Sequence, residues 1–333
     1  MSDVMTEVGT GKTPADSRIT HAGGKAGAWH RRLAFVAIFV PNIGMVWGAI
    51  LLFQGVVRVL DIALLVIMYA VTMFGVEAGF HRMVAHRAFQ TTGRLRALIV
   101  ILASMAVQGS AFYWAASHRR HHRYSDRPGD PHSPHMHPPD LSGWLRGLWH
   151  AHAGWLFVPE NIDYGKYALD LLKDKTMFRL HRFYPAWILL GLFIPTGIAV
   201  LYDATWDSAG RGFLWGGLVR IALVQHAVWS VNSLCHIFGR RPFQTGEKST
   251  NNVWLALTSF GGSWHNNHHA FQRTAYNAFS GWQFDPCYLV LRPLERLGMI
   301  WDVQCPTATE ITSRLRTGRS GVHTGEEEWT LNS

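Results

Sequence analysis

Cysteine is nearly absent from this chain. Its 333 residues include three cysteines, Cys235, Cys287 and Cys305, with no paired spacing. A disulfide framework is therefore not expected. Because no Cys-x-x-Cys motif occurs, the sequence encodes neither a zinc ribbon nor an iron–sulfur cluster.

Acidic side chains are also scarce. The 22 Asp and Glu residues are outnumbered by 31 Lys and Arg residues, and the formal charge is +9. Such an excess is typical of nucleic-acid-binding proteins. Here, however, the basic residues lie beside long apolar runs, which favours contact with anionic lipid or an anionic substrate. We therefore expect a lipid bilayer as a partner and no nucleic acid.

Charge is almost missing from four apolar runs, each long enough or nearly long enough to cross a bilayer, which takes about twenty residues. They predict transmembrane helices at about 33–53, 60–80, 186–202 and 213–236. The second run carries Asp61 and Glu77 near its ends. The fourth carries Arg220, which is expected to extend towards the outer interface. A fifth run, residues 97–114, is interrupted by polar residues and predicts a buried or interfacial helix instead.

With the N-terminus inside, most Arg and Lys residues near the predicted spans are cytoplasmic, while the outer loops hold little beyond Arg58 and Arg211. This distribution satisfies the positive-inside rule. We expect an integral protein of a bacterial inner membrane, with both termini and the functional site cytoplasmic. The expected organisation is a flexible N-terminus over 1–32, a membrane domain over 33–303 with a cytosolic cap formed by 81–185 and 237–303, and a polar tail over 304–333.

Nine histidines fall into four groups on the predicted cytoplasmic side. They occur in GFHRMVAHRAF, ASHRRHHRYSD, SLCHIFG and SWHNNHHAF, and comprise His81, His86, His118, His121, His122, His236, His265, His268 and His269. Neutral imidazole is the commonest side-chain metal ligand. Positions i, i+3 and i+4, as in SWHNNHHAF, share one face of a helix. The sequence therefore predicts a metal centre at this membrane face.

Donor chemistry narrows the choice of metal. Nine imidazoles exceed what one tetrahedral zinc ion uses, and the groups hold no oxygen ligands for calcium or magnesium. Imidazole suits iron, copper, zinc and nickel. Two non-haem iron ions that activate dioxygen fit best, and paired zinc or copper stays open. Asn232, one turn before His236, is expected to orient a metal-bound water.

The histidine groups HRMVAH, HRRHH and HNNHH, in this order, resemble the three histidine boxes of the membrane fatty-acyl desaturases. The stretches GVEAGFHR, HRYSDRPGDPHSPH, NSLCHIFG and LERLGMIWDV agree, so the resemblance runs from about residue 34 to 303. It implies an all-α protein with four transmembrane helices under a helical cytosolic cap. All nine histidines would ligate two iron ions, with Asn232 acting through water. The implied reaction introduces a cis double bond, of the Δ9 stearoyl-type branch, using dioxygen and two electrons.

The substrate linkage and the partners stay open. Ala116 and Ser117 stand where the animal acyl-CoA enzymes have an Arg-Asp pair, so an acyl-lipid or acyl-carrier substrate remains an alternative to acyl-CoA. No haem-binding His-Pro-Gly-Gly motif is present, so a separate donor, such as a ferredoxin-like carrier with its reductase, is expected. The same scaffold also suits a hydroxylase, an acetylenase or a decarboxylase. A non-catalytic metal-binding membrane protein is a remote alternative.

A polar stripe on the fourth predicted span is the candidate substrate contact. Gln225, Trp229, Asn232 and His236 follow at i, i+4, i+7 and i+11, which places them on one helical face. Gln225 and Trp229 are expected to line an acyl tunnel below the metals. Ordinary helix packing explains the same pattern.

Overall fold

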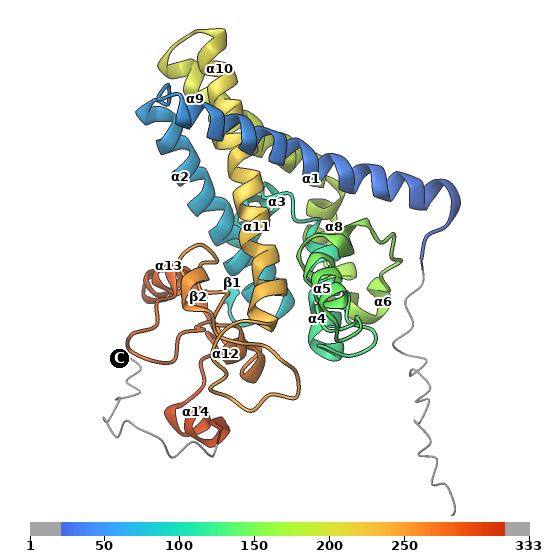
Figure 1. The fold of residues 1–333 in the computed structure, drawn as a ribbon. Coiled ribbons are helices and arrows are strands. Elements are labelled where there is room, and N and C mark those ends of the chain that lie inside the picture. The colour runs from blue at the N-terminus through green and yellow to red at the C-terminus, as the bar shows by residue number, and fades with distance from the viewer. Residues whose placement is uncertain (1–20, 317–333) are drawn as a thin grey trace, which may run out of the picture.

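The computed structural model describes residues 21–316, and this part of the chain is almost wholly helical (Figure 1). Four helical stretches are long and apolar enough to cross a membrane: Gly24–Phe53, Val59–Ala85, Tyr184–Tyr202 and Trp206–His236. The predicted all-α fold with four transmembrane helices is thus confirmed. The observed helices extend beyond the predicted runs, because polar residues at their ends also take part in helical backbone hydrogen bonding.

Two of the spans change helical type along their length. Helix α2 (Val59–Phe74) continues as a π-helix, Gly75–Ala85, and α10 (Trp206–Gly212) continues through a π-helical segment, Phe213–Val219, into α11 (Arg220–Ser233). The other two are α1 (Gly24–Phe53) and α9 (Tyr184–Tyr202).

The remaining elements form a cap at one end of the spans (Figure 1). Its helices are α3 (Gly93–Ser104), α4 (Ala111–Tyr124), α5 (Leu141–His152), α6 (Tyr164–Tyr167), α7 (Leu169–Leu172), α8 (Lys175–Arg182), α12 (His265–Ala270), α13 (Pro286–Arg296) and α14 (Ala308–Arg314). Short 3₁₀ turns occupy Gly154–Phe157, Leu234–His236 and Val253–Leu255. Strands β1 (Gln90–Thr91) and β2 (Ile300–Trp301) pair antiparallel, which joins the C-terminal part of the cap to the segment after the π-helix.

The predicted buried helix over 97–114 divides into α3 and α4. The chain turns between them, where Val107 and Gly109 adopt positive φ angles of 57° and 87°. The Ser110 hydroxyl then accepts a hydrogen bond from the Tyr113 amide and caps α4. α3 packs against the π-helix and, as expected, is no span.

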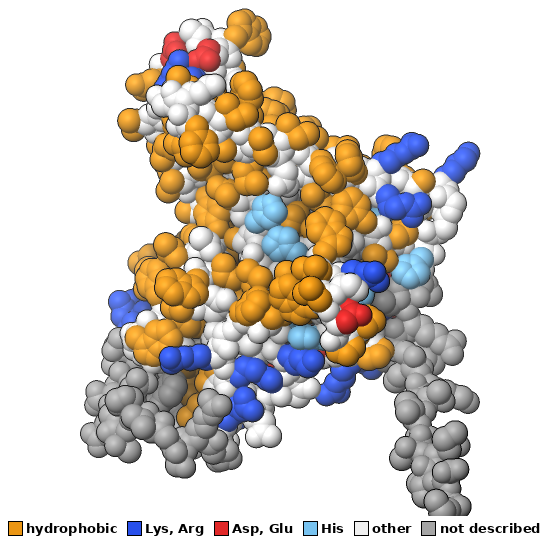
Figure 2. All heavy atoms as spheres, viewed as in Figure 1, with side chains coloured by type: hydrophobic (Ala, Val, Ile, Leu, Met, Phe, Trp, Pro, Cys, Tyr) orange, Lys and Arg blue, Asp and Glu red, His pale blue; other side chains and the backbone are white. Residues whose placement is uncertain are grey.

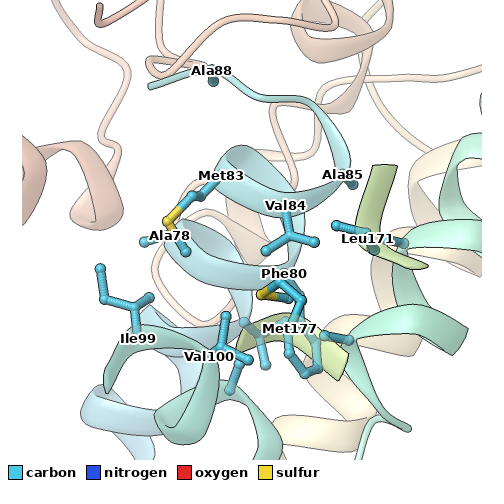
Figure 3. Close-up of a cluster of buried hydrophobic side chains, with 14 of the residues drawn as sticks. Ala78, Phe80, Met83, Val84, Ala85, Ala88, Ile99, Val100, Leu171 and Met177 are labelled. Atoms are coloured by element: carbon cyan, nitrogen blue, oxygen red, sulfur yellow. The ribbon is translucent and has the colours of Figure 1, made fainter. Parts of the chain in front are cut away.

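The main apolar core lies where the π-helix meets α3 and other helices of the cap. In Figure 3, Phe80 and Val84 of the π-helix point towards Val100 of α3 and towards Leu171 and Met177 of the cap. The spans themselves keep many apolar side chains on their outer faces, and Figure 2 shows hydrophobic side chains covering this part of the surface. An apolar surface of this kind suits contact with lipid.

Arg220 corrects one prediction. Its side chain does not extend to an interface but is fully buried. It donates hydrogen bonds to the carbonyl oxygens of Gly216, Met105 and Gly191, which lie on three different elements. A buried cation that satisfies several backbone acceptors holds the spans to the α3–α4 turn.

Candidate metal centre

The nine histidines singled out in the sequence converge into two adjacent clusters. In each cluster the ring nitrogens lie within 4.8 Å of one another. The first cluster comprises His81, His86, His118, His122 and His268, and the second comprises His121, His236, His265 and His269. The clusters touch, since the rings of His122 and His269 are 4.4 Å apart between centroids.

The π-helix supplies the first pair. His81 and His86 are five residues apart, and the amide of His86 donates to the carbonyl of His81 over 3.1 Å. This i to i+5 bond is that of a π turn, which returns residue i+5 to the side of residue i. The two rings consequently lie 5.0 Å apart between centroids. π turns are frequent at functional sites because they re-aim side chains in this way.

Helix α4 serves both clusters. His118 and His122, at i and i+4, share one face and enter the first cluster, whereas His121 enters the second. The last turn of α4 therefore stands between the two clusters. His236 reaches the second cluster from the end of the fourth span.

Helix α12 is only six residues long, and hydrogen bonds to residues on either side of it in the sequence hold it in place. The Asn251 side-chain oxygen accepts hydrogen bonds from the amides of Asn266 and Asn267. The Asn267 amide side chain in turn donates to the carbonyl of Asn277. These asparagines are buried and fix the helix although it is too short to be stable alone. α12 delivers His268 to the first cluster and two histidines to the second.

The nitrogen geometry of the first cluster suits a cation. The Nε2 atom of His118 lies 2.7 Å from that of His86 and 3.0 Å from that of His122. The Nε2 atom of His268 lies 3.0 Å from that of His81 and 2.9 Å from that of His122. A neutral imidazole has one N–H and one lone pair, so five Nε2 atoms this close bring several lone pairs together. A bound metal ion satisfies them all.

The second cluster contains buried nitrogens without a protein partner. The Nε2 atoms of His121 and His269 make no hydrogen bond within the described residues. The Nε2 atoms of His236 and His265, by contrast, lie 3.0 Å apart. Buried polar atoms are rarely left unpaired. Carboxylates lie beside this cluster, but its converging unpaired atoms are imidazole nitrogens. Such a donor set fits a transition metal better than calcium or magnesium, which prefer oxygen ligands.

Carboxylates behind the rings orient them, a feature absent from the sequence predictions. Glu77 accepts from His81 Nδ1 over 2.9 Å, Asp130 from His121 Nδ1 over 2.9 Å, and Asp126 from His236 Nδ1 over 2.9 Å. A proton held on Nδ1 leaves the Nε2 lone pair free for a metal. Glu77 had a signal, because it precedes His81 by one helical turn. Asp126 and Asp130 lie in a loop whose path the sequence does not reveal.

Electrostatics keeps most of these rings neutral. Burial, reinforced by the neighbouring imidazoles, lowers the pKa of six of them well below the usual range: His86, His118, His122, His265, His268 and His269. Burial also acts on His121, but the hydrogen-bonded carboxylate of Asp130 outweighs it and raises its pKa. Neutral imidazole is the form that binds metal.

The other predicted site residues lie on α11. Asn232 is half-buried one turn before His236. Gln225 is buried and donates to the carbonyl of Ala37 over 3.0 Å. Trp229 is buried and packs against Ile38 of α1. The role of Asn232 in binding water and those of Gln225 and Trp229 in contacting substrate stay predictions.

Comparison with known proteins points to a single family. The family model described as fatty acid desaturase matches residues 57–281. The chain is 43% identical over 277 residues, 83% of its length and 86% of the relative's, to the hex-5-enoyl-[acyl-carrier protein] acetylenase of Moorena producens (strain JHB). It is 34% identical over 69% of its length and 78% of the relative's to the sn-1 stearoyl-lipid 9-desaturase of Anabaena variabilis. It is 35% identical over 72% of each chain to the acyl-CoA C20 Delta5-desaturase of Anemone leveillei.

Proposed function

Because this chain belongs to the fatty acid desaturase family, we propose that it introduces a cis double bond into a saturated acyl chain, with position Δ9 as the first candidate. The observation that carries the proposal is the pair of adjacent, buried, all-histidine clusters. The nine histidines would hold two iron ions, and Asn232 would hold a water beside them. Iron held there would supply, with dioxygen, the oxidising power that unactivated C–H bonds demand.

The reaction balances with one molecule of dioxygen. Two hydrogens leave adjacent methylenes as two electrons and two protons, and two further electrons and two protons come from outside. Dioxygen takes up all four of each and leaves as two waters. The chain's own part is to exclude bulk water, to keep the imidazoles neutral, and to fix which carbons reach the clusters. This last effect is one of proximity.

The acyl chain would pass beside α11, with Gln225 and Trp229 along it. Trp229 is buried against α1 and the Gly154–Phe157 turn, in the same span, Trp206–His236, that ends at a histidine of the second cluster. A bulky ring at that depth limits how far the chain advances. The charged end of a carrier-linked or lipid-linked chain would remain at the cap, with residues 81–185 and 237–303 on the cytoplasmic side.

A second outcome has its own support. The relative at 43% identity is an acetylenase whose name specifies an acyl chain on a carrier protein. Ala116 and Ser117 are both small and buried, so this position offers no cation for a CoA headgroup. We therefore propose that a carrier-linked or lipid-linked chain is preferred to acyl-CoA. Formation of a triple bond is the second candidate activity.

The decisive experiment is expression in a host lacking unsaturated lipids, followed by mass spectrometry of double-bond position. Wild type should yield a monoene, or an alkyne if the second candidate holds, and His268→Ala should yield neither. The purified chain should contain about two iron ions. Active protein that contains zinc and no iron would contradict the proposal. Trp229→Ala should shift the position or the preferred chain length.

A further inference from the structure

The surface of the cap next to the clusters carries a basic basin. One pocket of about 450 Å³ is lined by Arg87, Arg119, Arg123 and Arg273 together with His86 and His122. A neighbouring pocket of about 420 Å³ is lined by Arg123, Arg127 and Arg314, and also by His122 and His269. Figure 2 shows Lys and Arg side chains in a row along this end of the molecule, which carries α12 and α14.

Both pockets end on the proposed metal ligands. His122, only half-buried, lines both pockets and belongs to the first cluster. His86 opens the first cluster to one pocket, and His269 opens the second cluster to the other. A molecule seated here would be separated from the converging ring nitrogens by single imidazole rings.

The basin keeps its positive charge. Arg87 and Arg119 both pair with Asp170, so two cations share one carboxylate. No acidic side chain lines the first pocket, where Arg123 and Arg273 are exposed. The second pocket contains one carboxylate, Glu247, against three arginines, so arginines outnumber carboxylates in both. Charge of one sign around a concave surface attracts a partner of the opposite sign and speeds its association.

Resting on the proposed function, we propose that this basin is the docking surface for an acidic one-electron carrier protein of the ferredoxin class. The desaturation needs two external electrons, and the described residues hold no Cys-x-x-Cys motif that could carry them. Two reduced carriers dock in turn, and each leaves oxidised by one electron. The arginines spread over two pockets, which is wider than a single phosphate group needs. They also lie at the end away from the α9–α10 turn, which favours a protein over a lipid surface (Figure 1).

The test reverses charge at the exposed part of the basin. The triple variant Arg87→Glu, Arg123→Glu and Arg273→Glu is compared with Arg146→Glu and Arg296→Glu, exposed arginines that line neither pocket. Full-length protein in nanodiscs is titrated with a plant-type [2Fe–2S] ferredoxin at several salt concentrations. Binding to wild type should weaken with salt, and the triple variant should bind at least about tenfold more weakly. The two control variants should change binding by less than about twofold.

A kinetic arm separates docking from chemistry. With ferredoxin, its reductase and NADPH, the triple variant should show a raised KM for ferredoxin, while single-turnover product formation with dithionite stays at the wild-type level. Wild-type ferredoxin binding in the triple variant would overturn the proposal, and so would a triple variant that loses the dithionite reaction while wild type retains it. Binding of anionic vesicles through the same arginines without ferredoxin binding would also overturn it. Arginine-dependent ferredoxin binding without any product in either assay would refute the proposed function and leave the docking surface standing.

Discussion

At the scale of single residues, the carboxylates hydrogen-bonded to the histidines set the orientation and the tautomer of the metal-binding rings. Asp130 is buried and accepts hydrogen bonds from the His121 ring and from the amides of Asp126 and His132. It thus fixes the His121 ring and the loop that follows α4 at the same time. Partners of this kind set the tautomer and the basicity of a metal-binding imidazole.

Asp130→Asn should lower metal affinity by about 10- to 100-fold, because the amide cannot supply the charge that holds the proton on His121 Nδ1. The measurement is iron per chain, by mass spectrometry, after dialysis against a weak chelator. Asp140→Asn is the matched control, since Asp140 is exposed and caps α5, a role that asparagine fills equally well. Equal iron retention by both variants would show that Asp130 only shapes the loop.

At the scale of elements, the sequence predicted the spans and α12 but not the π-helix. The apolar runs are a direct consequence of bilayer thickness, and HNNHH at i, i+3 and i+4 requires only an ordinary helical turn. His81 and His86 at i and i+5 would diverge on an α-helix. Their convergence depends on i to i+5 bonding in a segment that packs against α3, and no local sequence pattern predicts that bonding.

Gly75 is the residue that lets the π-helix approach α3. A Cβ atom there would lie 2.4 Å from the Ala103 nitrogen and 2.7 Å from the Leu102 carbonyl carbon, both backbone atoms that cannot move aside. Gly75→Ala should therefore cost about 1–3 kcal/mol of stability and displace the first histidine pair. Thermal unfolding in detergent and iron content would measure the two effects.

Gly197→Ala provides the control for this substitution. Gly197 also lies in a span, α9, but a Cβ atom there meets no neighbour within 4 Å. Alanine is the better helix former by about 1 kcal/mol, so this variant should be as stable as wild type or more stable. If both variants behave alike, close packing at Gly75 is not what positions the π-helix.

At the scale of the whole molecule, the grouping of all nine histidines followed from topology. Placing the ends of the spans on one side brought four distant segments together, and the structure joins them. The division of these histidines into clusters of five and four could not be predicted from topology, because it depends on how α4 and α12 are rotated against each other. The burial of Arg220 could not be predicted from topology either, because its acceptors Met105 and Gly191 lie on two other elements.

Concentrating neutral imidazoles in one place should make the folded protein sensitive to acid. The six histidines with lowered pKa stay neutral in the fold, whereas in the unfolded chain each takes up a proton below about pH 6.5. The unfolded state then binds more protons, so stability falls as the pH drops below that value. His121, with its raised pKa, acts in the opposite direction but is one group against six.

Between pH 7.5 and 5.5, each histidine that stays neutral in the fold should lower the free energy of unfolding by about 1 kcal/mol. Because neighbouring rings are coupled, the total loss should be smaller than the sum of six separate contributions. The midpoint of thermal unfolding of chelator-treated protein in detergent, taken at pH 7.5, 6.5 and 5.5, measures the effect. The fall should lie mainly below pH 6.5 and should reverse when the sample returns to pH 7.5, because it reflects titration rather than damage. A midpoint that stays constant or rises on acidification would mean that the clusters accept protons in the folded state as readily as free imidazole does.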